Sequence, residues 1–180
     1  VNLHRNKFLE GSEIVIIGNI KLDKLQKEAA ELSPASNYYK QKLHLLCESI
    51  DELVQPVIEE LVKHELTPIV IGGGQNNTLP IISAISKTLG PLNALNFDAY
   101  ADLRALEGRH NENGFSYAIQ RKVLNKYAVL GLHQNYNAAH MLKKMDGMSN
   151  VHYTFLEDIQ YADKSLLETT KFLIDKAYCT

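Results

Sequence analysis

A short apolar run that ends in three consecutive glycines is the feature that most constrains how this chain folds. Residues 69–71 read Ile-Val-Ile, and glycine occupies positions 72–74. A buried strand of a parallel sheet has this apolar character, and glycine permits the tight turn after it, through positive φ or close backbone approach. Open α/β sheets bind their ligands at the carboxyl ends of such strands. We therefore expect a strand at 69–71 that ends beside a ligand site.

Strand-like and helix-like segments alternate along the chain. Short apolar runs predict further strands; they cover residues 13–18, 92–97, 127–132 and 151–155. Apolar spacing of three and four residues predicts helices between them; these cover residues 43–65, 79–88, 115–124, 138–145 and 164–176. Pro56 predicts a kink in the first helix or its division into two. The alternation predicts an α/β fold in which helices sandwich a parallel β-sheet, as a single domain over residues 1–180.

Two aspartates follow the predicted strand at 92–97. Asp98 and Asp102 lie four residues apart, with Tyr100 between them. A buried carboxylate must be paired with a cation, hydrogen-bonded or bound to a metal. Arg104 and Arg109 are close enough in sequence to be the partners. Ion pairs that organise the loop and residual binding of a hard cation are both consistent with this pattern.

Four blocks of sequence carry a family resemblance. They read Gly-Gly-Gly-Gln-Asn-Asn at 72–77, Asp-Ala-Tyr-Ala-Asp-Leu-Arg at 98–104, Glu-Gly-Arg-His-Asn-Glu-Asn-Gly-Phe-Ser-Tyr-Ala at 107–118 and Gly-Leu-His-Gln-Asn-Tyr at 131–136. Together they resemble the ureohydrolases, the superfamily of arginase, agmatinase and formimidoylglutamase, and are nearest to its formimidoylglutamase-like branch. The resemblance implies an arginase-like three-layer α/β/α fold with a binuclear manganese site. In the family, this site activates a hydroxide that hydrolyses a C–N bond of a linear amidine.

The resemblance also implies that the chain is an incomplete copy of that fold. The family has a second pair of aspartates on a later strand, which would follow soon after Thr180. We therefore expect a fragment that lacks the C-terminal part.

The metal-ligand positions of the family are only partly kept. By resemblance, Asp98 and Asp102 match metal-binding aspartates, whereas Gln75 and Tyr100 stand where the family has histidine ligands. Asn113 is the one matched residue of the family's substrate-contact segment. A glutamine amide oxygen is a weak ligand, and tyrosine must lose a proton whose pKa is about 10 to coordinate well. We therefore assign no catalytic residue and expect weak or absent manganese binding.

Two functional hypotheses follow from the resemblance and the substitutions. The first is a family hydrolase of linear amidines whose activity is impaired or lost. The second is a noncatalytic relative, in effect a pseudoenzyme, that keeps the pocket for a small amidine-type ligand or serves in assembly. The replacements at positions 75 and 100 favour the second hypothesis, because neither new side chain is a donor comparable to imidazole.

The composition limits the partners. The 19 basic and 21 acidic residues are interspersed and give a net charge of −2, so no field suited to nucleic acid or an anionic membrane is expected. Cys47 and Cys179 lack CxxC spacing, which is typical of reduced thiols in a cytoplasmic protein. A sheet that lacks its next strand would leave an unpaired edge that recruits other chains. We therefore expect a homo-oligomer.

Overall fold

The computed structural model of the chain describes residues 14–161 and 165–178. Its helices are α1 (Asp23–Glu31), α2 (Tyr39–Lys63), α3 (Thr78–Leu89), α4 (Gly114–Gln120), α5 (Ala139–Asp146), α6 (Leu156–Tyr161) and α7 (Leu166–Tyr178), with the 3-10 turns η1 (Gln75–Asn77) and η2 (Gln134–Tyr136). The strands are β1 (Leu92–Phe97), β2 (Leu124–Leu132) and β3 (Val151–Phe155). Within these described ranges, no helix is both long enough and apolar enough to cross a membrane.

The three strands form a parallel sheet in the order β1-β2-β3. Phe97 of β1 pairs with Leu130 of β2, and Val129 of β2 pairs with Tyr153 of β3. Parallel neighbours need a crossover connection, which α4 provides between β1 and β2 and α5 provides between β2 and β3. All three strands therefore end at the same edge of the sheet.

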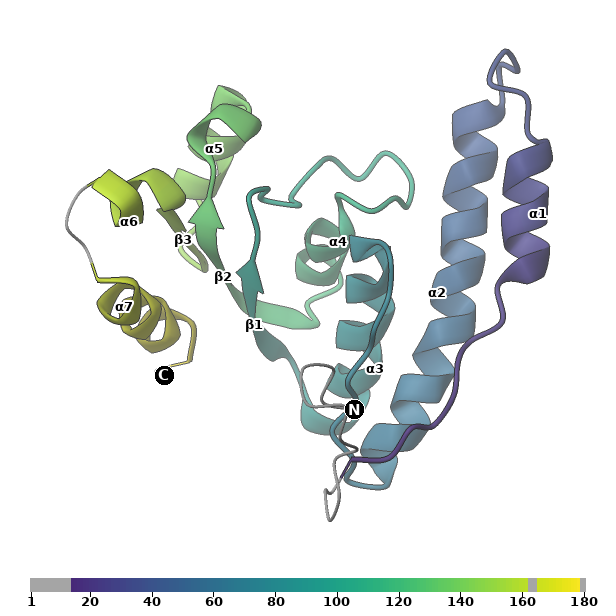
Figure 1. Ribbon diagram of the computed structural model, residues 1–180, viewed down its shortest axis with the longest axis horizontal. Coiled ribbons are helices and arrows are strands. Elements are labelled where there is room, and N and C mark those ends of the chain that lie inside the picture. The colour runs from purple at the N-terminus through teal and green to yellow at the C-terminus, as the bar shows by residue number, and fades with distance from the viewer. Residues whose placement is uncertain (1–13, 162–164, 179–180) are drawn as a thin grey trace, which may run out of the picture.

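Helices cover both faces of this sheet, as the sequence predicts. Alternate side chains of a strand point to opposite faces. Tyr127 and Val129 of β2 belong to one core with Phe115 of α4, whereas Leu130 packs in another with Leu173 of α7. Figure 1 shows α3 and α4 on one side of the strands and α7 on the other. The predicted class, a parallel α/β sheet between helical layers, is confirmed.

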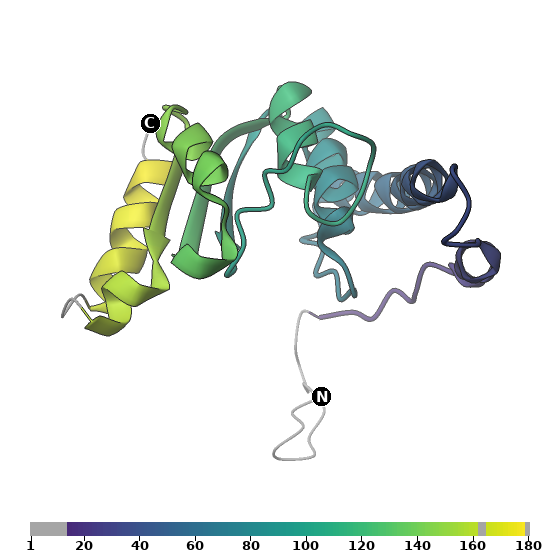
Figure 2. The ribbon, with the colours of Figure 1, turned by 90° about the horizontal axis from the view of Figure 1, so that it is seen from above.

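The long helix α2 joins the rest of the chain through α3. Val54, Ile58 and Val62 recur at four-residue steps and pack with Ala84 of α3. The helix α1 lies along α2 in both ribbon views (Figures 1 and 2). The predicted division of α2 is wrong, because one helix runs from Tyr39 to Lys63 with Pro56 inside it.

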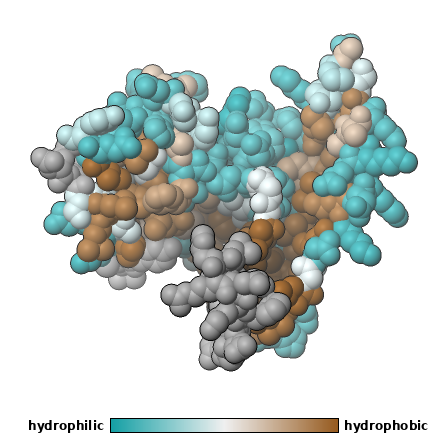
Figure 3. Space-filling view, viewed as in Figure 1, coloured by the Kyte–Doolittle hydropathy of each residue, from teal (hydrophilic) through white to brown (hydrophobic). Residues whose placement is uncertain are grey.

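Two predicted strands do not form. Residues 14–18 and 69–71 have no regular secondary structure and join no sheet in the described part of the chain, while Glu13 lies outside it. The side chains of Ile16 and Ile71 are 89% and 95% exposed. Figure 3 shows hydrophobic surface on the lower part of this face, where the segment before α1 runs. An apolar run becomes a strand only where another strand takes up its hydrogen bonds, and neither run has such a neighbour among residues 14–161 and 165–178.

The remaining helices and strands lie closer to the ranges predicted from the sequence. The structure adds α1 and α6, which the sequence analysis does not predict, and it begins β2 at Leu124 and not at Tyr127. The last helix begins at Leu166, and Lys164, its predicted start, lies outside the described residues. Short helices such as α6 carry too few apolar repeats for periodicity to detect them.

Candidate functional site

The loops that follow β1 and β2 meet at the carboxyl edge of the sheet. The backbone N–H of His133 donates to the carbonyl of Ala99 at 3.0 Å. Asn137 fixes this contact with its side chain: its Nδ2 donates to the carbonyls of Ala99 and His133, and its Oδ1 accepts from the N–H of Ala101 at 2.9 Å. These hydrogen bonds therefore hold the loops after β1 and β2 together at one edge of the sheet.

The glycine segment brings a third loop to the same edge. None of the glycines at 72–74 has a positive φ, so that part of the sequence expectation is wrong. The expected close approach does occur, because a Cβ at Gly72 would lie 2.7 Å from Asn77 Nδ2 and one at Gly74 would lie 2.6 Å from Asn76 Oδ1. At Gly73, nothing lies within 4 Å of the corresponding position. The segment places η1, and with it Gln75, over the end of β1.

Gln75 and Asp98 are in direct contact. The Nε2 of Gln75 donates to Oδ2 of Asp98 at 2.8 Å and to Oδ1 of Asn96 at 3.4 Å, and its Oε1 accepts from the hydroxyl of Thr78 at 3.3 Å. The side chain of Gln75 thus uses both ends of its amide inside the site. The structure places this substituted ligand position beside a retained carboxylate.

Asp102 lies in the same site in an unusual state. Its φ is 49°, in the left-handed region, and the residue is buried with Oδ2 lacking any hydrogen-bond partner. Burial, the nearby charge of Asp98 and that of Glu112 raise the pKa of Asp102 to about 7. The two aspartates are therefore electrostatically coupled, and neither is paired with an arginine.

The side chain of Tyr100 is 48% exposed and stacks on Tyr136, with ring centroids 5.4 Å apart. Tyr136 in turn stacks on His133 at 4.9 Å, and His133 Nδ1 lies 3.3 Å from Glu157 Oε1. Only the backbone N–H of Tyr100 reaches the site, where it donates to Asp98 Oδ1 at 2.9 Å. The phenol belongs to an aromatic stack on the surface of the site.

The prediction that Arg104 and Arg109 pair with the two aspartates is wrong. Arg104 Nη1 donates to Glu112 Oε2 at 2.7 Å. Arg109 is buried, and its guanidinium binds Asp51 of α2 through Nε at 2.7 Å and Nη2 at 3.2 Å. Arg109 Nη2 also donates to the carbonyl of Asn76 at 2.8 Å, so this one side chain joins α2, η1 and its own loop. The two arginines organise the loop, and within residues 14–161 and 165–178 the aspartate pair has no cationic partner.

Asn113 is fully buried at the end of that loop. Its Nδ2 donates to the carbonyls of Ala105 and Gly108, and its Oδ1 accepts from Arg109 Nη1 at 2.8 Å and from the N–H of His110 at 3.1 Å. These four bonds use the whole capacity of an amide side chain. Asn113 shapes the loop before α4, and contact of this residue with a substrate stays a prediction.

The donor set does not fit the histidine-containing manganese site that the resemblance implies. In the described part of the chain, no group of three or more His, Cys, Asp or Glu side chains is arranged to hold a metal ion. The position that would supply one imidazole holds an amide already bonded to Asp98, and the other holds a phenol that stacks outside. Two carboxylates remain, one of which has an unpaired oxygen.

Several residues that build this site give little or no signal in the sequence. Asn96 of β1 donates through Nδ2 to the hydroxyl of Tyr127 at 3.1 Å, and that hydroxyl donates to the carbonyl of Ala101 at 2.9 Å. The signal for this pair was a polar residue, Asn96, within an apolar strand. Asp51 gave no such signal, because 58 residues separate it from Arg109.

Comparison with known proteins decides the family. The model of the arginase family matches residues 1–180 of this chain. The chain belongs to the arginase family. An agmatinase of Blochmanniella floridana is 30% identical over 74 residues, which are 41% of this chain and 24% of that protein. The chain therefore spans well under half the length of this relative.

Solved structures share the fold of this arginase-family chain. Formimidoylglutamase of Bacillus subtilis matches with a TM-score of 0.62 and 21% identity over 69% of this chain and 39% of that one. Formiminoglutamase of Trypanosoma cruzi with Mn2+ matches with a TM-score of 0.59 and 19% identity over 70% of this chain and 44% of that one. At these identities the likeness establishes the arginase-like fold, of which this chain covers less than half.

Proposed function

We propose that this chain is a noncatalytic member of the arginase family, which uses the carboxyl edge of its sheet to bind a small amidine-type ligand and does not hydrolyse it. The observation that carries the proposal is the hydrogen bond from Gln75 Nε2 to Asp98 Oδ2 at 2.8 Å. An amide donor on this carboxylate takes the place that a metal ion would need.

The chemistry of the two substituted positions supports this proposal. Neutral imidazole binds first-row divalent metals well, whereas a glutamine amide oxygen and a protonated phenol bind them weakly. Thr78 also donates to Gln75 Oε1, so this oxygen is already occupied inside the protein. Without tightly bound metal the family's hydroxide nucleophile does not form at neutral pH.

An amidine-type ligand suits the groups that remain. Amidinium is a planar cation with N–H donors, and carboxylates accept from such a group in paired hydrogen bonds. Asp98 and, when deprotonated, Asp102 supply negative charge that neither Arg104 nor Arg109 neutralises, and the half-exposed ring of Tyr100 can take a cation on the face that does not stack on Tyr136. Binding therefore requires no metal at this site.

One observation favours a second candidate, which is residual hydrolysis of a C–N bond of a linear amidine. The buried Oδ2 of Asp102 lacks a partner, and an acidic pair of this kind suits a hard cation that keeps some of its water. Under this candidate, manganese would bind weakly and activity would appear only at high metal concentration.

Metal content and turnover distinguish the two candidates. The chain is purified in excess manganese, dialysed, and analysed for metal by plasma mass spectrometry. Hydrolysis of agmatine, arginine and N-formimidoyl-glutamate is then assayed with and without added manganese. We expect well below one manganese per chain, no turnover, and a thermal shift with at least one of these amidines. Stoichiometric metal that resists dialysis would contradict the proposal.

Restoring both histidines tests the assigned positions. The double variant Gln75→His, Tyr100→His should bind manganese more tightly than the wild-type chain by calorimetry, because imidazole replaces two poor donors. Ala30→His, at an exposed position of α1 with no histidine or carboxylate three or four residues away, serves as the control for a histidine placed elsewhere. An unchanged affinity in the double variant would show that residues 75 and 100 do not face the metal-binding positions.

A further inference from the structure

A cavity of about 330 Å³ lies between α1, the first half of α2, the turn η1 and the loop at residues 109–111. None of Gln75, Asp98, Tyr100 and Asp102 lines it. Small-molecule sites in proteins have volumes of about 300–1,000 Å³. The cavity is therefore large enough for a small ligand and is distinct from the site described above.

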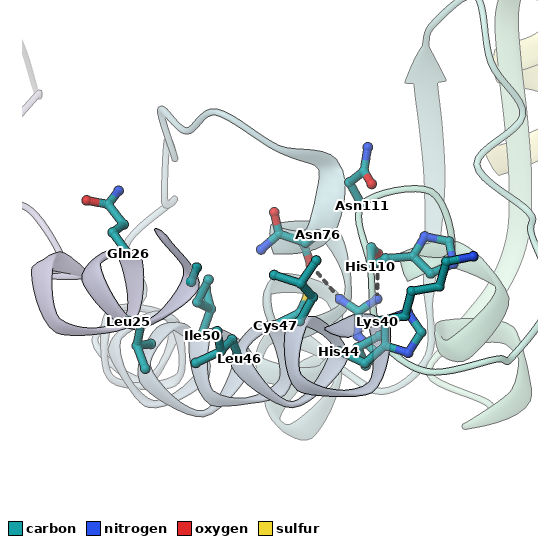
Figure 4. A pocket seen from close by; sticks show the side chains of 13 residues that line it. Leu25, Gln26, Lys40, His44, Leu46, Cys47, Ile50, Asn76, His110 and Asn111 are labelled. Carbon is teal, nitrogen blue, oxygen red and sulfur yellow. Dashed lines mark hydrogen bonds between the residues drawn. The ribbon is translucent and has the colours of Figure 1, made fainter. Parts of the chain in front are cut away.

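One end of the cavity is apolar. Leu25 and Ala29 of α1 face Leu46 and Ile50 of α2 across it, as Figure 4 shows for the three larger side chains. Cys47 lies between the two ends, and burial raises the pKa of its thiol to about 11. At neutral pH this thiol is uncharged and behaves as a small hydrophobe. This end favours a hydrocarbon group.

Three basic side chains gather at the other end of the cavity. Figure 4 shows Lys40, His44 and His110 close together, with the Lys40 side chain reaching toward His110. The rings of His44 and His110 have centroids 5.8 Å apart. The ammonium group of Lys40 forms no ion pair with the described residues, so it is available to a ligand.

Among the described residues that line this end of the cavity, Lys40 is a cation without an ion pair. Arg109 also lines the cavity, but both oxygens of Asp51 accept from its guanidinium. Glu107 lies 3.4 Å from His110 Nε2 and is the carboxylate nearest to that ring. Burial lowers the pKa of His110. Its Nδ1 accepts from the N–H of Glu112 at 3.2 Å and its buried Nε2 faces Glu107, so this ring forms part of the wall and Lys40 is left to bind an anion.

We propose that this cavity binds a small amphipathic carboxylate. Its hydrocarbon chain lies against Leu46 and Ile50, and its carboxylate accepts a hydrogen bond from the ammonium group of Lys40. The inference rests on two observations in one cavity: an apolar end formed by two packed helices, and an unpaired ammonium group at the opposite end. A carboxylate matches that end in charge, and an amine does not.

Titration with three ligands of equal chain length tests the charge recognition. Octanoate, octan-1-ol and octylamine are each titrated into the full chain by calorimetry, below their aggregation concentrations. We expect octanoate to bind at one site and octylamine to bind at least ten-fold more weakly, with octanol between them. Equal affinity for all three ligands, or no binding of octanoate, would overturn the proposal.

Two pairs of variants locate the site. Ala29→Phe fills the apolar end and should abolish binding, whereas Ala30→Phe, at the exposed neighbouring position, should leave it unchanged. Lys40→Gln should weaken octanoate at least five-fold and leave octanol unaffected, whereas Lys42→Gln on the same helix should affect neither. Circular dichroism melting establishes that each variant is folded. Equal effects within either pair would overturn the assignment.

A measurement on the unmodified chain needs no variant. Because Cys47 lines the cavity, saturating octanoate should slow its alkylation by iodoacetamide at pH 9 at least five-fold, as measured by peptide mapping that separates Cys47 from Cys179. An unchanged rate would overturn the proposal. A second outcome would also overturn it: the Ala29→Phe variant sediments differently from the wild-type chain, and octanoate does not protect Cys47. The cavity would then be a contact between protein chains.

Discussion

Asp102 combines three features that each cost free energy at the scale of a single residue. It has a left-handed backbone conformation, its carboxylate is buried, and one oxygen has no partner. Its folded-state pKa of about 7 lies above the value of about 3.9 for an unfolded chain. The folded state therefore binds the proton more tightly, and the free energy of unfolding falls as pH rises from about 4 to about 7.

The variant Asp102→Asn should therefore be more stable than the wild-type chain, with a gain that grows between pH 5 and pH 8. Asparagine removes the buried charge and adopts the left-handed conformation well. The gain at pH 8 should be on the order of a few kcal/mol in urea unfolding of metal-free, EDTA-treated protein. Asp23→Asn, at an exposed carboxylate, should show no such trend. A gain independent of pH would mean that the charge of Asp102 is not the cause.

Two glycines should differ sharply in their tolerance of alanine. Gly108 has a φ of 113°, and a Cβ there would overlap the ring of His44. Gly73 has an ordinary backbone conformation and open space around it. Gly108→Ala should therefore lower the free energy of unfolding by on the order of 1–3 kcal/mol or more, while Gly73→Ala should change it little. Similar melting temperatures for the two variants would contradict this difference.

At the scale of elements, α2 contains a proline without being divided. Pro56 lies exposed in the middle of the helix, where it removes one backbone hydrogen bond. The buried stripe of Val54, Ile58 and Val62 packs on α3 on either side of it. Tertiary packing of this stripe therefore outweighs the local preference of proline to end a helix.

Replacing Pro56 should reveal how much free energy of unfolding is lost by a proline inside the helix. Pro56→Ala restores the N–H donor and should raise the free energy of unfolding by on the order of 1–3 kcal/mol, measured by urea unfolding. Glu52→Ala, another exposed position one turn earlier, should change it by less than about 0.5 kcal/mol. A loss of stability in Pro56→Ala would contradict this local cost of proline.

At the scale of the whole molecule, exposed apolar segments set the behaviour in solution. Ile14, Val15, Ile16 and Ile17 are all exposed, as are Ile69, Val70 and Ile71. Segments with high β-propensity, no charge and unpaired backbone groups add readily to other chains.

We therefore predict that the chain self-associates, with a mass that rises with concentration in sedimentation or light scattering. The double variant Ile16→Lys, Ile71→Lys should shift the association to higher concentration, because charge on these segments opposes strand addition. Leu45→Lys, at an exposed apolar position of α2, is the matched control. A monomer at high concentration would contradict the prediction. Cys179, near the end of the chain, lies outside the described residues.

Much of the fold could be predicted because its signals are local. The apolar spacing in α2, the runs that form β1, β2 and β3, and the alternation of strand with helix all depend on neighbours within a few residues. Residues 14–18 and 69–71 carry an equally strong strand signal and do not form strands. A strand also needs a neighbouring strand to pair with, and the sequence of the segment does not specify that neighbour.

The site divides in the same way. The resemblance to the ureohydrolases selected Gln75, Asp98, Tyr100 and Asp102 as positions of one site at the edge of the sheet. The contacts that their side chains make were not predictable: Gln75 donates a hydrogen bond to Asp98, whereas the ring of Tyr100 stacks on Tyr136. These outcomes depend on which of several competing contacts has the lowest free energy in the folded chain.

The sequence by itself determined the class of fold, the family blocks and the absence of the two expected histidines, because each of these is a property of residue type and spacing. Only the tertiary structure decided that Arg109 pairs with Asp51 and not with Asp98 or Asp102. It alone also buried Oδ2 of Asp102 without a hydrogen-bond partner and placed a lysine at the end of the cavity opposite its apolar side chains. Charge pairing and burial depend on distances between residues far apart in the chain, and folding alone sets those distances.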